Sequence, residues 1–199
     1  MIEPWPSIAS QPLMDFRIFR VRRDRKVSPR TGEEHDFFVL DCPDWVNVVA
    51  ITTDQRILLI EQYRHGTNTV ELEIPGGVMD PEDANPVATG VRELREETGY
   101  EGVNARVIAQ VSPNPAFMSN TCFTVLVEGC QPKHPLEFDQ AEEITTRLAP
   151  LTELAGLMAA GRIRHSLVLV ALYHYLGSWS LPPGRFENSV QTTPGGTLP

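Results

Sequence analysis

Three glutamates, Glu93, Glu96 and Glu97, fall close together in the segment RELREET. Their spacing of i, i+3 and i+4 puts the three side chains on one face of a helix. Like charges at this spacing destabilise a bare helix by roughly 0.2–0.5 kcal/mol per pair. We therefore expect positive charge among them, from the neighbouring Arg92 and Arg95, from a bound cation, or from both.

A glycine turn precedes these acids in the segment IPGG (residues 74–77). Glycines let backbone come close to a ligand and let carbonyl oxygens point outward. Carboxylates and carbonyls are the oxygen ligands that hard cations such as Mg²⁺ prefer, and the absence of an accompanying His or Cys argues against zinc. For RELREE by itself the alternative is a solvated surface helix with ion pairs, but the combination with PGG favours a metal site.

The acids must be carried by a helix over residues 86–98, which Gly99 would end. Val91 and Leu94 are predicted to pack on a sheet, so that the acids face away from it. Strand-like runs cover residues 16–43, as a pair around a turn, and residues 45–64, as a hairpin. Single strands are predicted over residues 68–77, 105–113 and 122–130. Further helices are predicted over residues 150–162 and 165–177.

This order of elements predicts an α/β fold with a mixed sheet flanked by helices. We divide the chain into residues 1–43 (an N-terminal antiparallel strand appendage), residues 44–177 (the main domain) and residues 178–199, a tail rich in Pro and Gly.

Composition narrows the class of protein. The 199 residues have a formal net charge of −9, which argues against nucleic-acid binding and means that an anionic substrate would need metal ions between it and the protein. We find no secretory signal and no apolar run long enough for a membrane span. Three widely spaced cysteines without a CxxC motif read as reduced thiols, so we expect a cytoplasmic protein.

The glycine turn and the acidic helix together resemble a known motif. The stretch GG…RELREETGY is similar to the Nudix box, G-x5-E-x7-R-E-U-x-E-E-x-G-U, where U is a bulky apolar residue. The matching positions are Gly77, Arg92, Glu93, Leu94, Glu96, Glu97, Gly99 and Tyr100. The loop departs from the motif: Asp83 stands where a Glu is expected, one extra residue follows it, and Glu82 is the other candidate for that position.

The resemblance implies the Nudix α/β/α sandwich over about residues 45–176. The segment LLIEQYRHGTNTVELEIPGG (residues 58–77) looks like the corresponding stretch of the ADP-ribose and nucleoside diphosphate sugar pyrophosphatases. Pro115 matches a proline that many of them carry beyond the box. Their N-terminal strands commonly form a homodimer and help to build the partner's site, so a homodimer is implied here, with residues 16–41 as such strands.

The resemblance also implies roles for individual residues. Mg²⁺, or Mn²⁺ in its place, would be held by Glu93, Glu96 and Glu97 with the carbonyl of Gly76. The general base would be Glu142 or Glu143, between which the sequence does not choose. The residues implied or proposed to bind a nucleoside diphosphate sugar are Arg64, Glu73, Phe37 or Phe38, and Pro115.

Several of these residues have an ordinary structural alternative. Arg64 could instead form a surface ion pair with Glu61 or Glu71. His165 and His174 are interpreted as helix-packing or surface residues. Asn120 stands nearest to the position where many relatives have a Glu.

Two further hypotheses remain open for the whole protein. It could be a Nudix hydrolase of another substrate class (nucleoside triphosphates, coenzyme A or dinucleoside polyphosphates), or a non-catalytic domain that senses a nucleotide. The stretch EQYR…ELE and Pro115 count against the first hypothesis. All helix acids of the box are retained, which counts against the second.

Overall fold

The computed structural model describes residues 1–137 and 143–178, so Glu142 and residues 179–199 of the expected tail lie outside the described residues. A mixed sheet forms the body, with strand order β10-β5-β4-β9-β8 and with β6 and β7 paired to β5 and β4. Strands β4 and β9 run parallel, and the other pairs are antiparallel. The strands are β4 (Trp45–Thr52), β5 (Arg56–Arg64), β6 (Thr69–Glu73), β7 (Gly76–Val78), β8 (Tyr100–Val111), β9 (Cys122–Pro132) and β10 (Ile144–Pro150).

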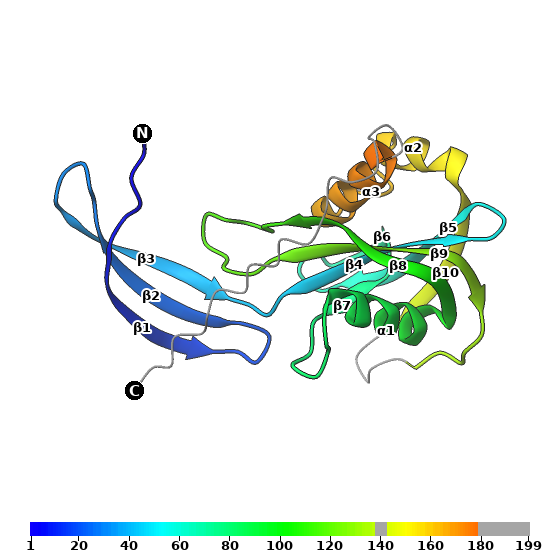
Figure 1. The fold of residues 1–199 in the computed structure, drawn as a ribbon, viewed down its shortest axis with the longest axis horizontal. Coiled ribbons are helices and arrows are strands. Elements are labelled where there is room, and N and C mark those ends of the chain that lie inside the picture. The colour runs from blue at the N-terminus through cyan, green and yellow to red at the C-terminus, as the bar shows by residue number, and fades with distance from the viewer. Residues whose placement is uncertain (138–142, 179–199) are drawn as a thin grey trace.

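Helices cover both faces of this sheet (Figure 1). Helix α1 (Pro86–Thr98) lies on one face, while α2 (Leu151–Ala159) and α3 (Ser166–Ser178) lie on the other. Along β4, Val48 joins the core cluster that includes Leu94 of α1, and Val49 joins the cluster that includes Leu172 of α3. Because both faces are buried, the central strands read as continuous apolar runs rather than as alternating ones. The predicted mixed sheet between helices is confirmed.

Helix α1 has the predicted limits. The side chain of Asn85 caps its start by accepting from the backbone N–H groups of Val87 and Ala88, and Pro86 occupies the first turn. Gly99 ends it in the left-handed conformation, with φ of 72°.

The buried face of α1 differs in part from the predicted one. Leu94 is buried as predicted, but Val91 is 38% exposed, and Gly90 and Glu97 are buried instead. Gly90 allows this rotation of the helix, because a Cβ at this position would lie only 3.1 Å from the Cβ of Val125 on β9. Glu97 therefore faces the sheet and the strand β7, and does not point to solvent as the sequence had suggested.

The N-terminal appendage is an antiparallel sheet with the order β1-β2-β3. Its strands are β1 (Ser7–Asp15), β2 (Arg20–Val27) and β3 (Glu34–Asp41). The pair β2–β3 was predicted, but β1 was missed, because SIASQPLMD contains Pro12 and all of its residues are exposed. A proline is tolerated there because β1 is an edge strand. The sheet projects from one end of the body (Figure 1).

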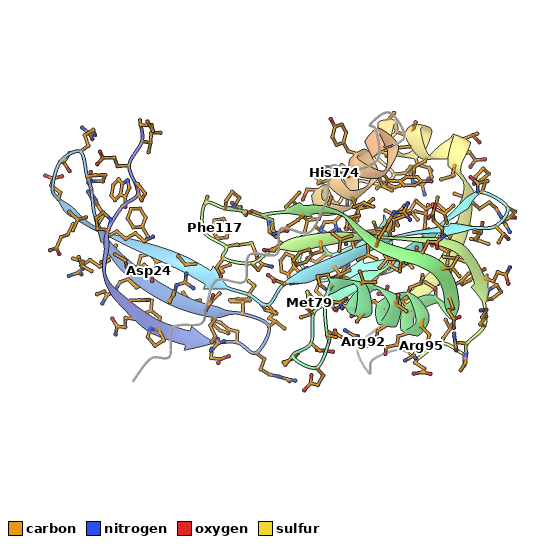
Figure 2. All side chains as sticks on the ribbon, in the orientation of Figure 1. Asp24, Met79, Arg92, Arg95, Phe117 and His174 are labelled. Atoms are coloured by element: carbon orange, nitrogen blue, oxygen red, sulfur yellow. The ribbon has the colours of Figure 1, made fainter. Side chains whose placement is uncertain are left out.

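The loop between β8 and β9 joins this sheet to the body. The N–H of Leu40 on β3 donates to the carbonyl of Phe117, and the N–H of Ser119 donates to the carbonyl of Leu40. The Ser119 hydroxyl also donates to Asp41. Figure 2 shows Phe117 at the junction between the two parts.

Strand β10, which pairs antiparallel with β5, was also missed, because its segment ITTRLAP follows an acidic stretch that was read as a loop. Among the described helices, none is both long enough and apolar enough to cross a membrane.

Candidate active site

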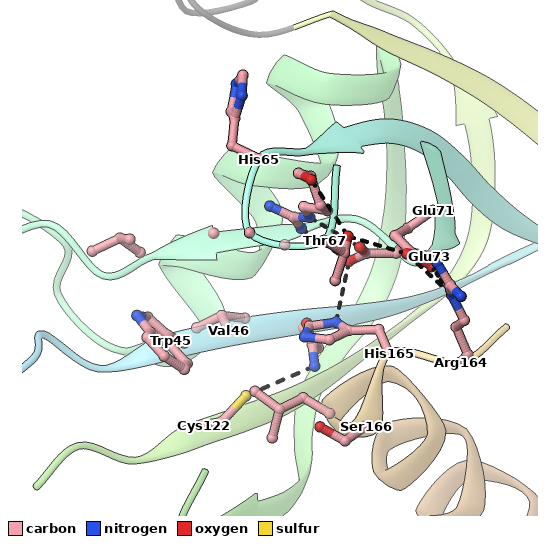
Figure 3. A pocket seen from close by; sticks show the side chains of 17 residues that line it. Trp45, Val46, His65, Thr67, Glu71, Glu73, Cys122, Arg164, His165 and Ser166 are labelled. Carbon is pink, nitrogen blue, oxygen red and sulfur yellow. Dashed lines mark hydrogen bonds and ion pairs between the residues drawn. The ribbon is translucent and has the colours of Figure 1, made fainter. Parts of the chain in front are cut away.

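A cleft of about 720 Å³ opens between strands β4 to β7 and the start of α3 (Figure 3). Its walls come from the beginning of β4, the β5–β6 hairpin, the glycines of β7 and the residues that lead into α3. Segments far apart in the sequence therefore meet here, including the Gly76–Gly77 turn and Arg64.

The glycines of β7 are required by close packing on both sides. Gly76 and Gly77 pair antiparallel with Asn47 and Val46 of β4. A Cβ on Gly76 would clash with the carbonyl oxygen of Val46, and a Cβ on Gly77 would clash with the carboxylate of Glu93. The turn thus lies directly against the acidic helix, as its position in the predicted site demands.

Glu97 is tied to the same turn. Its carboxylate accepts a hydrogen bond of 3.0 Å from the backbone N–H of Gly76, and the residue is 3% exposed. The side chain of Glu97 thereby links helix α1 to the glycine turn that lines the cleft.

Arg92 supplies positive charge among the acids. Its Nη1 atom lies 3.0 Å from both Glu93 Oε1 and Glu96 Oε2. Its Nη2 atom lies 2.9 Å from Asp83 and also donates to the carbonyl of Val78. One guanidinium therefore balances carboxylates from the helix and from the loop before it.

Asp83 occupies the loop position that the motif assigns to a glutamate. Besides Arg92, it accepts from the hydroxyl of Thr89 at 3.0 Å and from the N–H of Asp80 at 3.1 Å. Glu82 is exposed. The hydrogen bonds from Arg92, above all, lower the pKa of Asp83 to about 2. Although this loop departs from the motif, it keeps an acid, Asp83, in contact with Arg92 of the box.

This geometry predicts that Asp83 stabilises the fold in a pH-dependent way. Its pKa falls from 3.8 to about 2 on folding, so its stabilisation is fully present above pH 4 and disappears as the pH falls toward 2. We expect Asp83→Asn to lower the free energy of unfolding by about 2 kcal/mol near neutral pH and by roughly half of that at about pH 3. Urea denaturation across this range would measure both differences.

Asp80→Asn is the matched control. Asp80 also contacts Arg92, at 3.3 Å, but its side chain is 57% exposed, so screening by water should keep its effect small. A gap between wild type and Asp83→Asn that stays constant with pH would contradict the assigned role of Asp83.

The acids of α1 offer the right chemistry for a hard cation, since all their donor atoms are oxygens. Glu93 and Glu96 are turned toward Arg92, and Glu97 is turned toward the Gly76 amide. Within residues 1–137 and 143–178, no group of three or more His, Cys, Asp or Glu side chains is arranged as a metal site. Arg92 contacts one oxygen of Glu93 and one of Glu96, and the metal site remains a prediction.

The opposite wall of the cleft carries a buried carboxylate between two basic groups. Arg64 forms a two-pronged hydrogen-bonded pair with Glu73, with both distances at 2.9 Å. The acid that it contacts here is thus not one of the two considered from the sequence. Glu73 is 2% exposed, and His165 Nδ1 lies 3.2 Å from it. Burial acts against ionisation, yet His165 and Arg64 lower the pKa of Glu73 to about 2.

A second ion pair stands beside the first. Glu71 and Glu73 are alternate residues of β6 and so lie on the same face of the strand. Arg164 Nε lies 2.8 Å from Glu71, and the Thr69 hydroxyl lies 2.6 Å from it. The hydrogen bonds from Arg164, above all, lower the pKa of Glu71 to about 2.

The sequence analysis did not place Arg164 or His165 in the site, although both line the cleft. Two features of the sequence could have indicated this second ion pair. Basic residues stand side by side directly before α3, and acids stand at i and i+2 on β6. The pairing across 93 residues between Arg164 and Glu71 could not be read from either segment alone.

Other predicted site residues lie elsewhere. Phe37 on the N-terminal sheet, exposed Pro115 and exposed Glu143 are not among the residues that line the cleft. Glu142 falls outside the described residues. Asn120 is buried and donates to the carbonyl of Pro43 at 3.0 Å.

Fold and site agree with one protein family. The family model of the NUDIX domain matches residues 43–171, and the chain therefore belongs to the Nudix family and is a Nudix hydrolase. The resemblance found in the box of α1 is confirmed.

Similar proteins illustrate the range of the family. CMP-5'-(N-acetyl-N-hydroxy-3-aminopropyl)phosphonate hydrolase of Streptomyces rubellomurinus is 31% identical, over 73% of this chain and 70% of its own length. ADP-ribose pyrophosphatase of Mycobacterium tuberculosis is 27% identical, over 83% of this chain and 80% of its own. A crystal structure of an ADP compounds hydrolase superposes with a TM-score of 0.80 at 21% identity and covers 90% of this chain and 96% of that one, which shows the shared fold.

Proposed function

We propose that this protein hydrolyses the pyrophosphate bond of ADP-ribose or another nucleoside diphosphate sugar, giving a nucleoside monophosphate and a sugar phosphate, with Mg²⁺ as cofactor. The observation that carries the proposal is the cleft, where the Gly76–Gly77 turn backed by the acids of α1 faces the basic wall around Arg64. Relatives named ADP-ribose pyrophosphatase support the same substrate class.

The acids and the turn have complementary roles. Glu93, Glu96 and Glu97, with the carbonyl of Gly76, would hold Mg²⁺, and Mn²⁺ would substitute for it. When bound, the cation would neutralise phosphate charge and lower the pKa of the attacking water. Glu97 stays anchored to the Gly76 N–H, so the helix and the turn act as one unit.

Arg64 binds the diphosphate. Its side chain is 42% exposed, and the bidentate pair with buried Glu73 fixes the orientation of the guanidinium in the cleft wall. A planar guanidinium suits phosphate oxygens, which accept from it in the same forked manner as a carboxylate. Glu73 therefore acts by orienting Arg64, since its own carboxylate is covered.

The general base is Glu142 or Glu143, in the segment between β9 and β10. A carboxylate in that position would take the proton from the attacking water as the P–O bond forms. Glu143 is exposed, which leaves its carboxylate accessible to water.

We further propose a homodimer built on the N-terminal sheet. Several large apolar side chains of this sheet are exposed, among them Ile8, Met14, Phe37 (40%) and Phe38 (60%), and a gathering of exposed apolar residues suits contact with a second chain. In the dimer, Phe37 and the loop that carries Pro115 would approach the base of a nucleotide bound to the partner.

A substrate panel tests the proposed reaction. ADP-ribose, GDP-mannose, dGTP, coenzyme A and a CMP-linked phosphonate are incubated with enzyme and Mg²⁺, and the products are separated by chromatography. We expect ADP-ribose or GDP-mannose to give the highest kcat/KM, with AMP and ribose 5-phosphate as the products of ADP-ribose. The phosphonate is included because of the Streptomyces relative. Preference for dGTP or coenzyme A would reject the diphosphate sugar class, and binding without any product would indicate a sensor.

A further inference from the structure

We propose that His165 is a substrate-contacting residue of this cleft, whose Nε2 atom donates a hydrogen bond to an oxygen of the substrate diphosphate. This inference rests on the proposed function, because it names a further contact for the same substrate.

The two nitrogens of the ring lie in different surroundings. The side chain of His165 is 40% exposed and lines the cleft, yet its Nδ1 atom is buried. Since Nδ1 is buried beside Glu73, Nε2 is the ring nitrogen left to meet a ligand in the cleft. Figure 3 shows the imidazole in the cleft wall, with the contact from Nδ1 leading to Glu73.

The position of the ring is fixed by its neighbours. His165 directly precedes α3, and its carbonyl accepts from the N–H of Leu169 in the first turn of that helix. Arg164 is bound to Glu71, and Glu73 lies two residues further along the same face of β6. Two buried acids of one strand thus hold two consecutive basic residues, so the imidazole enters the cleft in a preorganised orientation.

The charges suit an anionic ligand. Glu73 remains ionised at neutral pH, because its pKa is about 2, and its Oε2 atom lies 3.2 Å from Nδ1. A phosphate oxygen can accept a hydrogen bond from Nε2 while Nδ1 faces the carboxylate of Glu73. Arg64 is held by the same carboxylate, so Glu73 orients two basic groups toward one diphosphate.

The competing explanation is purely structural: His165 could serve the protein only by neutralising the buried Glu73. Both explanations require Nδ1, but only the substrate contact requires Nε2. The two amide side chains separate these atoms, since Asn places its amide nitrogen near the position of Nδ1, whereas Gln reaches the position of Nε2.

The test compares His165→Asn with His165→Gln. We expect His165→Asn to keep the wild-type melting temperature and to raise KM for ADP-ribose by about 10-fold or more, the loss typical of a hydrogen bond to a charged group. His165→Gln should retain a KM closer to wild type, even where its melting temperature falls. A wild-type KM in His165→Asn, together with a raised KM in His165→Gln, would overturn the proposal.

A binding experiment separates failure of this inference from failure of the proposed function. The wild-type protein is titrated, in the presence of Mg²⁺, with a non-hydrolysable ADP-ribose analogue in which a methylene group replaces the bridging oxygen. The imidazole signals are followed by NMR, with His165 assigned from the signal missing in His165→Asn. We expect its ring signals to shift on binding. Shifts elsewhere in the cleft without any at His165 would overturn the inference alone, whereas no shift of any signal would count against ADP-ribose as a ligand.

Discussion

Glu97→Gln is expected to lower kcat for ADP-ribose hydrolysis by at least about 10²-fold. The metal ion that Glu97 is proposed to hold would stabilise the charged transition state by several kcal/mol, and loss of this ligand would weaken that stabilisation. The fold should survive the change. Glu97 is buried and accepts from the Gly76 N–H, and a glutamine oxygen can still accept that hydrogen bond. What is lost is the negative charge next to the cleft. Steady-state kinetics with saturating Mg²⁺ and a thermal melt would measure both effects.

Glu153→Gln provides the matched control for this substitution. Glu153 is an exposed helical glutamate in the first turn of α2, which covers the face of the sheet opposite α1, so the same chemical change there should leave kcat unaltered. Near-normal turnover of a well-folded Glu97→Gln protein would place the metal site elsewhere. A large fall in melting temperature would instead show that the charge is needed for the fold.

Removal of divalent metal is expected to abolish ADP-ribose hydrolysis, with a loss of at least about 10³-fold, and Mg²⁺ or Mn²⁺ should restore it. The reason is electrostatic. The chain has a net charge of −9, and the acids of α1 lie beside the cleft that would receive an anionic diphosphate. Arg92 offsets part of this charge but is already shared among Asp83, Glu93 and Glu96.

The chelation experiment needs a control for unfolding, for which a melting curve in the same chelator serves. Titration with Mg²⁺ should then return activity along a saturable curve, and that curve should shift to higher concentration in Glu96→Gln, because Glu96 is a proposed ligand. Activity that survives complete chelation would contradict a metal-dependent mechanism.

The elements around the site could be predicted where their signals are local. The limits of α1 follow from Asn85, Pro86 and Gly99, which cap a helix through neighbouring backbone groups. The strands of the central sheet were recognised because their apolar runs are bounded by turns. β10 was missed because it is defined by pairing with the distant strand β5. β1 pairs with the neighbouring strand β2, and it was missed because its segment contains Pro12 and has no buried residue.

The contacts of the site depend on the fold to different degrees. The sequence already placed Glu93, Glu96 and Glu97 on one helix and identified Gly76 as their neighbour. It left open whether Asp83 or Glu82 occupies the loop position, and the structure resolves this through the hydrogen bonds of Asp83 with Arg92.

Taken alone, the sequence determined the family, the acidic helix and the glycine turn, because the spacing of i, i+3 and i+4 has the same geometric meaning in any helix. The tertiary structure decided which face of that helix is buried, and it turned Glu97 toward Gly76. It also brought Arg164 and His165 to the acids of β6. These contacts join segments up to 93 residues apart, so they exist only once the sheet has assembled and α3 has packed upon it.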